Sequence, residues 1–357
     1  MPRILIAASG TGGHIFPALA LAEALPSSWE VDWLGVPDRL ENQIVPQQYS
    51  LTTVRLGGLQ GNLFQKIFQF IRLFAATKFV ISFIQERNIK VLFTTGGYIS
   101  APSILAAKVS GIKIILHESN AYPGRVTRAL GRLCDVVALG LPKASQYLSG
   151  SRTVLTGTPV RKSFLVPQPV PMWVPSGKGP LIVVLGGSQG ALRLNQMVRF
   201  VSPCFLAKGC RIVHLTGRND HETSSIHHPN LVTKTFSDEI PGLLQHADLV
   251  ISRAGAGTIS ELAICGTPAV LVPYPSAKDD HQNINALYAA ECGAAIIIHE
   301  NDPDHHSLLT TLDRLLANRL SKKDTSRDFL KEMQEGMKVL ACREAEENLV
   351  EILLNLT

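Results

Sequence analysis

Cysteine is scarce in this sequence, and no two cysteines lie at the spacing of a redox or metal motif. Six occur among 357 residues, and none belongs to a Cys-x-x-Cys pair. Most lie in apolar segments, which is typical of reduced core thiols in a cytosolic protein. The six are Cys134, Cys204, Cys210, Cys265, Cys292 and Cys342. We therefore expect no disulfide framework.

Long uninterrupted apolar runs are also missing. Although 45% of the residues are hydrophobic, no stretch combines the length and apolarity of a transmembrane helix. The N-terminus leads directly into a predicted strand, Arg3–Ala8, and has none of the features of a signal peptide. The sequence therefore predicts a cytoplasmic protein.

Charge is low and weakly biased. Charged residues make up 18% of the chain, and the formal net charge is +5. This mild excess suits an anionic substrate or an anionic membrane surface, but it is too diffuse to indicate nucleic acid. No DNA- or RNA-binding motif is present. We therefore predict no nucleic-acid partner.

The length and the alternation of strand and helix patterns predict two α/β domains. Residues 167–180 contain five prolines, which is typical of a linker, and the pattern then restarts with a strand over 181–185. We predict a first domain over 1–163, a linker over 164–180, a second domain over 181–340 and a C-terminal helix over 341–357 that could pack back on the first domain. The fold class is α/β, with two Rossmann-like domains facing a central cleft.

The stretch Leu249–Gln282 has the clearest chemical pattern. A buried strand ends at Ser252, a small-residue loop follows, and a helix begins near Ala256. Free N–H groups and the positive end of a helix dipole can bind phosphate at such a turn. Glu261, one turn further on, could accept hydrogen bonds from a ribose diol. The alternative is that the turn is one of the many in α/β folds and that Glu261 is on a solvated face.

Similar glycine turns recur at Gly10–His14, Gly96–Gly97 and Gly186–Gly190. The first of them does not fit the G-x-G-x-x-G spacing of dinucleotide-binding domains, and the second predicted strand does not end in a convincing ribose-binding acid. A nicotinamide-dependent dehydrogenase is therefore a weak interpretation.

The segment Leu63–Ile84 contains six of the 13 phenylalanines. Its basic residues include Lys66, Arg72 and Lys78, and it has no acidic residue. One interpretation is a buried amphipathic helix. The other is an apolar, basic-rimmed surface that rests on an anionic membrane. Its predicted membrane-contacting residues are Phe64, Lys66, Ile67, Phe68, Ile71 and Arg72.

A metal site is not expected. Asp302-Pro303-Asp304 has the D-x-D spacing of metal-dependent glycosyltransferases, but its position just before an apolar helical pattern predicts a helix N-cap. The histidine pairs at 227–228 and 305–306 lack convergent acids, so solvated loops are the better interpretation. We predict neither a metal nor another cofactor.

Six ordered motifs resemble the MurG family. They are Gly10-Thr11-Gly12-Gly13-His14, Gly96-Gly97-Tyr98, His117-Glu118-x-Asn120, Thr156-Gly157-x-Pro159-Val160-Arg161, Gly186-Gly187-Ser188-Gln189-Gly190 and Arg253–Glu261. The family transfers N-acetylglucosamine from its UDP donor to the lipid-linked muramoyl-pentapeptide, lipid I, forming lipid II for peptidoglycan. The resemblance spans nearly the whole chain and implies a GT-B fold. Ser119 and Thr158 depart from the family's more usual Gln and Asn.

The resemblance also implies the site residues and partners. Glu261 is expected on the ribose, Gln282 on the sugar and the backbone of Ser237 on the uracil. The remaining expected contacts are Thr11, Gly12, Gly13, Asn120, Arg161, Ser188, Ala256, Gly257 and Thr258. The partners would be UDP-N-acetylglucosamine, the lipid-linked acceptor and an anionic membrane. The protein would bind peripherally at the cytoplasmic face of the plasma (inner) membrane.

The implied chemistry is an inverting displacement at the anomeric carbon by a UDP-GlcNAc-dependent hexosyltransferase. Helix N-termini can stabilise the leaving diphosphate without a metal. His14 is the predicted base for the attacking hydroxyl, because an imidazole can accept a proton near neutral pH; the alternative is that His14 only hydrogen-bonds at a helix start. Competing functions are a UDP-N-acetylglucosamine 2-epimerase, another GT-B glycolipid glycosyltransferase and a non-catalytic nucleotide-sugar sensor.

Overall fold

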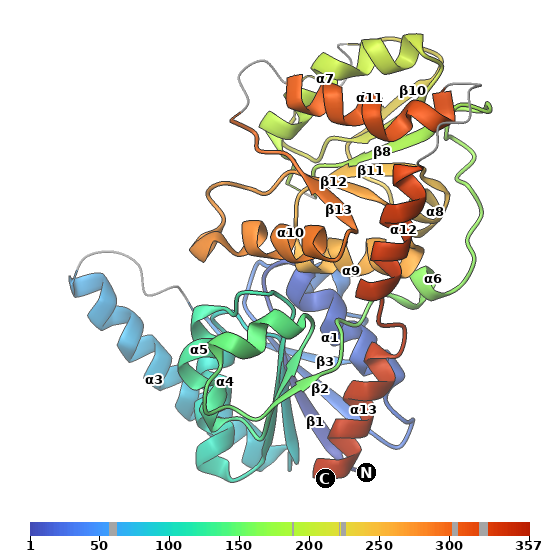
Figure 1. Cartoon of the computed structure of the whole chain (residues 1–357). Helices are drawn as coiled ribbons and strands as arrows, with labels where there is room; N and C mark the ends of the chain where they lie inside the picture. Colours follow the sequence, from blue (N-terminus) through green and yellow to red (C-terminus); the bar gives the residue numbers. More distant parts are fainter. Residues whose placement is uncertain (57–62, 188, 221, 223–225, 302–305, 321–327) are drawn as a thin grey trace. The chain divides into compact units, whose positions relative to one another are not determined.

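The chain forms two compact α/β units in a computed structural model (Figure 1). One unit consists of residues 1–161 and 342–357, and the other of residues 162–341. The structure describes residues 1–56, 63–187, 189–220, 222, 226–301, 306–320 and 328–357. In the helix that begins at Leu63, side chains are described from residue 69 onward.

The described part of the first unit contains a parallel sheet in the order β3-β2-β1-β4-β5-β6-β7. Its strands are β1 (Arg3–Ala7), β2 (Glu30–Gly35), β3 (Ser50–Thr53), β4 (Val91–Thr94), β5 (Lys113–Glu118), β6 (Val136–Leu139) and β7 (Thr153–Leu155). Its α-helices are α1 (Gly12–Ala24), α2 (Glu41–Ile44), α3 (Leu63–Glu86), α4 (Ser100–Ser110), α5 (Arg125–Leu130) and α13 (Ala345–Leu356). The chain starts at β1, fills one side of the sheet and then crosses to β4. A topological switch point therefore lies between β1 and β4.

Alternate residues of β1 face opposite layers of helices, as the two-residue period of a strand requires. Ile4 and Ile6 belong to a core cluster with Leu349 and Leu353 of α13. Leu5 and Ala7 belong to the cluster on the other face, which includes residues of α3 and α4. Both faces of the sheet are covered, which explains why the strands β1, β4 and β6 are mostly apolar.

The described part of the second unit repeats this plan, with the sheet order β10-β9-β8-β11-β12-β13. Its strands are β8 (Leu181–Leu185), β9 (Arg211–Leu215), β10 (Leu231–Lys234), β11 (Leu249–Ser252), β12 (Ala269–Leu271) and β13 (Ala295–Ile297). Its α-helices are α6 (Lys162–Leu165), α7 (Leu192–Ala207), α8 (Ile240–His246), α9 (Ala256–Cys265), α10 (His281–Glu291), α11 (His306–Leu320) and α12 (Phe329–Leu340). Here the switch point lies between β8 and β11.

The proline-rich segment is bound to the second unit. Gln168 N–H donates to Gln245 Oε1 at 2.7 Å, and Trp173 Nε1 donates to a carboxylate oxygen of Glu239. A side chain on Gly242 would meet Pro169 O at 2.4 Å, so α8 lies directly against the segment. The segment predicted as a linker therefore has fixed contacts with α8.

Two element ends position residues of the predicted motifs. Helix α1 begins at Gly12, so the later glycines of the Gly10–His14 turn already adopt the first helical turn. Strand β5 ends at Glu118, so His117 and Glu118 lie at its carboxyl end.

The phenylalanine-rich helix α3 has two different halves. Val80, Phe83 and Ile84 are buried in the core cluster shared with α4. In contrast, Phe70 and Phe74 are 58% and 64% exposed. The N-terminal end of α3 extends away from the strands of its unit (Figure 1). The fully buried interpretation of this helix is therefore wrong for its described N-terminal half.

Candidate active site

His14 lies at the switch point of the first unit. Its Nδ1 is 2.6 Å from the carbonyl oxygen of Thr95, at the end of β4. Because a carbonyl can only accept, Nδ1 carries a proton, and in the neutral imidazole the lone pair is then on Nε2. The turn beneath the ring is made by Gly96 and Gly97, whose φ values of +89° and +79° suit glycine. The fold therefore holds this imidazole in the tautomer that a base acting through Nε2 requires.

A buried carboxylate supports the glycine loop that precedes His14. Glu41 is fully buried; its Oε2 accepts from Gly10 N–H at 3.1 Å and its Oε1 from Val36 N–H at 2.8 Å. The carboxylate thus joins the first turn of the site to the end of β2. The sequence analysis missed Glu41, because Gly10 lies 31 residues away in the chain and no local motif marks the contact.

Glu118 organises the segment that contains Asn120. Its Oε1 accepts from Asn120 N–H and Nδ2 at 3.1 and 3.0 Å, and its Oε2 accepts from Gly124 N–H at 2.8 Å and Thr127 Oγ1 at 2.7 Å. A carboxylate with four donors is well suited to fix a loop and poorly suited to accept a substrate proton. Glu118 is therefore a positioning residue.

His117 is buried beneath this loop. Its Nε2 is 3.1 Å from Gly157 O, and its Nδ1 is 3.4 Å from Ser119 Oγ. Burial lowers the pKa of His117 from its ordinary value, because desolvation disfavours the imidazolium. Thr158, the other departure from the family pattern, is also buried. Ser119, the first departure, is half-buried.

Arg161 lies close to helix α1 in the first unit. Its guanidinium carbon lies 4.9 Å from the centroid of the Phe16 ring, on α1. The Phe16 ring in turn packs on Gly12, where an added Cβ would lie 2.8 Å from it. Thr11 and Gly13 are exposed beside these residues. Thr11, Gly12, Gly13, His14, Asn120 and Arg161 thus all belong to the first unit.

The switch point of the second unit is formed by the turns after β8 and β11. A Cβ on Gly217, which has a φ of +79°, would lie 2.2 Å from Gly190 N, so the turn after β9 closely supports the turn after β8. Asn195 Nδ2 donates to Thr216 O at 2.9 Å and to Asp220 Oδ2 at 2.6 Å. Ser188, one of the predicted contacts, lies outside the described residues.

His214 completes this buried network. Its Nε2 is 3.0 Å from Asn195 Oδ1. The same network contains an ion pair, in which Arg199 Nη1 is 2.8 Å from Asp220 Oδ2. Burial, assisted by the positive charge of Arg199, lowers the pKa of His214 to about 4. The imidazole is therefore neutral near pH 7, and the network supports the glycine turn without adding charge to it.

Helix α9 begins at the second switch point. Ala256, Gly257 and Thr258 are its first three residues, so their N–H groups precede the first intrahelical hydrogen bonds. A Cβ on Gly257 would meet no atom within 4 Å, which leaves space for a ligand close to the backbone. Glu261 is half-buried further along α9. The arrangement can bind an anion at the helix start and a diol beside it.

Gln282 lies at the start of α10. Its Oε1 accepts from Tyr274 N–H at 3.0 Å, which orients its amide nitrogen as a donor for other groups. Ser237, at the end of the turn after β10, is buried, and its Oγ accepts from Glu239 N–H at 3.1 Å. The side chain of Ser237 is thus used in the turn, which leaves its backbone for a ligand.

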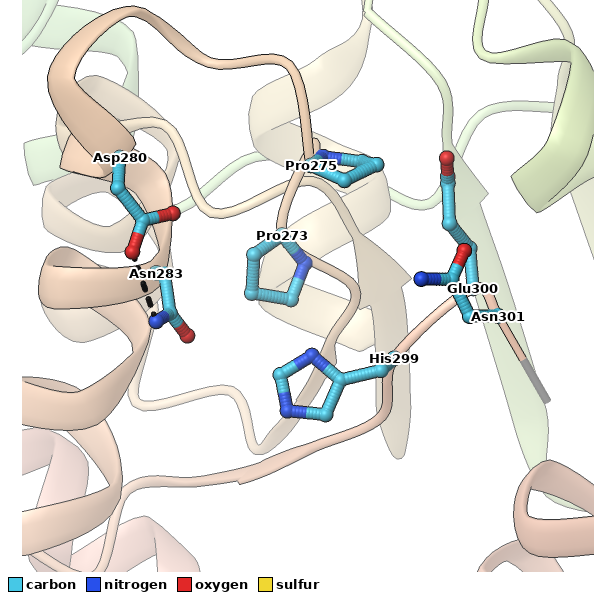
Figure 2. A pocket seen from close by; sticks show the side chains of 7 residues that line it. All are labelled: Pro273, Pro275, Asp280, Asn283, His299, Glu300 and Asn301. Atoms are coloured by element: carbon cyan, nitrogen blue, oxygen red, sulfur yellow. Dashed lines mark hydrogen bonds between the residues drawn. The ribbon is translucent and has the colours of Figure 1, made fainter.

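A cavity of about 150 Å³ lies next to these segments (Figure 2). It is lined by Pro273, Pro275, Asp280, Asn283, His299, Glu300 and Asn301. Asp280 Oδ2 accepts from Asn283 Nδ2 at 3.0 Å, as the dashed line in Figure 2 marks. Asp280 belongs to the stretch Leu249–Gln282 that the sequence analysis singled out, whereas His299, Glu300 and Asn301 follow β13 and were not predicted, because no local motif marks them.

Family models and relatives show which proteins this chain is similar to. Residues 4–139 match the glycosyltransferase family 28 N-terminal domain and residues 181–340 its C-terminal domain. A Prochlorococcus marinus (strain MIT 9303) protein, named UDP-N-acetylglucosamine--N-acetylmuramyl-(pentapeptide) pyrophosphoryl-undecaprenol N-acetylglucosamine transferase, is 59% identical over 99% of this chain and 98% of its own. A Synechococcus sp. (strain CC9605) protein of the same name is 59% identical over 100% and 99%.

Solved structures extend the similarity to the fold. Acinetobacter baumannii MurG has a TM-score of 0.78 at 28% identity, covering 99% of this chain and 100% of that one. A candidate UDP-N-acetylglucosamine 2-epimerase from Listeria monocytogenes has a TM-score of 0.70 at 14% identity, covering 98% of this chain and 95% of that one. The second similarity shows a shared fold alone.

Proposed function

Since this chain belongs to the MurG family within glycosyltransferase family 28, we propose that it transfers N-acetylglucosamine from UDP-N-acetylglucosamine to the muramoyl-pentapeptide of lipid I, forming lipid II. The observation that carries this proposal is 59% identity along essentially the full length to proteins named for that reaction. The two switch points supply the chemistry: an oriented imidazole in one unit and a helix start with a diol-binding acid in the other.

The donor is proposed to bind at the second switch point. The diphosphate accepts from the first N–H groups of α9, where the helix dipole also favours negative charge. Glu261 accepts from the ribose hydroxyls, the backbone at Ser237 pairs with the uracil, and the amide of Gln282 donates to the sugar. As the leaving UDP gains charge, the helix start stabilises it without proton transfer.

The acceptor hydroxyl is proposed to lose its proton to His14. Thr95 O holds the proton on Nδ1, so Nε2 can take the hydroxyl proton while the oxygen attacks the anomeric carbon from the face opposite UDP. The product then has inverted, β configuration. Asn120, held by Glu118, lies in the same unit and is proposed to bind the acceptor.

One experiment separates the competing functions. The protein is incubated with UDP-N-acetylglucosamine with and without lipid I, and products are identified by mass spectrometry and NMR. Transfer only in the presence of lipid I is expected. Epimerised sugar nucleotide without acceptor would instead identify an epimerase, and binding without turnover would identify a sensor. Either result would overturn the proposal.

We further propose that the protein works peripherally at the cytoplasmic face of the plasma membrane. Among the described residues, no helix is both long and apolar enough to cross a bilayer. The acceptor has a lipid tail that stays in the bilayer, so the enzyme must meet it at the surface. Phe70, Ile71 and Phe74 are exposed on α3, and the Lys78 ammonium lies 5.0 Å from the Phe74 ring.

Vesicle co-sedimentation tests this surface. The predicted residues Phe64, Lys66, Ile67 and Phe68 have side chains outside the described part, so the described residues make the sharper variant. Phe70→Ser/Phe74→Ser is expected to lose most binding to anionic vesicles, and added salt should weaken wild-type binding. Phe200→Ser is the matched control, because Phe200 is 59% exposed in the other unit. Equal sedimentation of the double variant and wild type would overturn the membrane proposal.

A further inference from the structure

We infer that Glu300 and Arg253 form a positioning pair for the donor site, in which Glu300 orients Arg253 and Arg253 ties together the turns that hold diphosphate and sugar. This inference rests on the proposed function. Arg253 immediately follows β11 and precedes the anion-binding turn into α9. Glu300 follows β13, two strands away in the sheet. The pair therefore joins strand ends at the edge of the sheet where the donor is proposed to bind.

The contacts of Arg253 run to both of its neighbours. Its Nη2 forms an ion pair with Glu300 Oε2 at 2.6 Å. Its Nη1 donates to Val272 O at 3.1 Å and to Pro273 O at 3.3 Å, at the end of β12. Its guanidinium carbon also lies 5.3 Å from the centroid of the Tyr274 ring. A planar guanidinium can make these contacts together, whereas an ammonium cannot.

These contacts belong to a closed ring of interactions. Tyr274 N–H donates to Gln282, on α10. From the same helix, the buried Asn285 donates its Nδ2 to Ala254 O at 3.2 Å, next to Arg253 in the chain. The ring therefore joins the phosphate-binding turn to the residue proposed to bind the sugar. A shift of Arg253 would move both ligand-binding segments.

The burial of the pair argues for a geometric role. The side chains of Arg253 and Glu300 are only 14% and 9% exposed. A buried ion pair adds little net stability, because desolvation offsets much of the attraction. Glu300 and Pro273 also line the cavity drawn in Figure 2, so the pair sets the shape of that edge. Holding the loops in one arrangement is what the pair can contribute.

The test compares Glu300→Ala, Glu300→Gln and Arg253→Lys with a matched control. Asp248→Asn serves as the control, because Asp248 directly precedes β11 whereas Arg253 directly follows it. Asp248 Oδ2 accepts from Leu181 N–H at 2.8 Å. Calorimetry with UDP-N-acetylglucosamine, kcat and KM for the donor, and thermal unfolding are measured for each protein.

Glu300→Ala and Arg253→Lys are expected to raise the donor KM and Kd about tenfold, a change of about 1.4 kcal/mol, with kcat changed less. Glu300→Gln keeps an acceptor oxygen and is expected to recover most of the affinity. Asp248→Asn should lower the melting temperature without changing KM. If Glu300→Ala lost stability but kept wild-type KM and Kd, the pair would be merely structural and the inference wrong. If wild type itself failed to bind UDP-N-acetylglucosamine, the proposed function would fail, and this inference with it.

Discussion

The two switch points hold their glycine turns with opposite charges. In the first unit, the carboxylate of Glu41 accepts from Gly10 N–H, a neutral donor in the turn that contains His14. In the second unit, the cation Arg253 donates to backbone carbonyls, and Glu300 neutralises it. Because Glu41 already occupies Gly10 N–H, that group is not available to a phosphate. Similar strand–turn–helix units thus differ in the side chain behind the turn, in keeping with the proposed roles of proton transfer in the first unit and binding of an anionic leaving group in the second.

The largest expected effect concerns the first switch point alone. His14→Ala removes the proposed base and should lower kcat by about 10²- to 10⁴-fold, while the affinity for UDP stays within about twofold. Single-turnover rates and calorimetric titration with UDP check the two parts. His228→Ala, in a loop of the second unit, is the control. Unchanged kcat in His14→Ala would assign the proton to another group and end the proposed division of roles.

The second prediction concerns how the free energy of unfolding depends on pH through His214, beside the second switch point. The pKa of His214 is lowered from 6.5 to about 4 in the folded protein, so the unfolded chain binds a proton between these values when the folded one does not. The free energy of unfolding is therefore highest, as far as His214 is concerned, above about pH 6.5. It falls by about 3 kcal/mol as the pH drops toward 4.

Chemical unfolding of wild type and His214→Gln across pH 4 to 7 measures this dependence. The variant should show a shallower loss of stability in acid than wild type. His246→Gln, at an exposed position of the same unit, should keep the wild-type slope. Parallel curves for wild type and His214→Gln would show that the buried network does not sense pH.

Donor binding sharpens the comparison next. Glu261→Ala should weaken the binding of UDP-N-acetylglucosamine by about 1–3 kcal/mol, the range for losing hydrogen bonds to a charged group. Isothermal titration checks it, with Glu335→Ala on the exposed face of α12 as the control. A folded Glu261→Ala protein with wild-type affinity would remove Glu261 from the ribose.

Glu41→Gln probes the support of the first turn. The amide has one acceptor oxygen for two N–H donors, so Gly10 or Val36 loses its partner, at a cost of about 1–3 kcal/mol in unfolding free energy. Because this turn directly precedes His14 in the chain, its disturbance should displace the imidazole. We therefore expect kcat to fall while the donor Kd is unchanged. An altered donor Kd with an unchanged kcat would contradict this prediction, because it would mean that Glu41 supports donor binding in the second unit.

The smallest expected effect is that of a chelator. Since helix N-termini can stabilise the leaving diphosphate, excess EDTA should leave the rate of transfer unchanged. Turnover is followed before and after chelation, and again after Mg²⁺ or Mn²⁺ is added. Loss of activity that either ion restores would contradict the role of the α9 N-terminus.

The sequence predicted the repeating architecture because that architecture has local signals. Buried parallel strands are short apolar runs, and the turns after β1 and β11 are marked by glycines beside His14 and Ala256. The residues behind the turns could not be predicted in this way. Glu41 is 31 residues from Gly10, and Glu300 is even further from Arg253 in the chain, so only the folded sheet shows which donors they meet. The exposure of Phe70 could not be predicted either, because it depends on where α3 extends away from the strands of its unit.

The return of α13 to the first unit has a consequence for how the protein is made. Leu349 and Leu353 lie in one core cluster with Ile4 and Ile6. In the sequence, however, the whole second unit, Lys162–Ala341, lies between the two segments that form the first unit. At ribosomal speeds of 5–20 residues per second, synthesis of that intervening segment takes on the order of 10 s. During this time one face of the N-terminal sheet lacks part of its cover. The first unit can therefore complete its core only after the second unit and α13 have been synthesised.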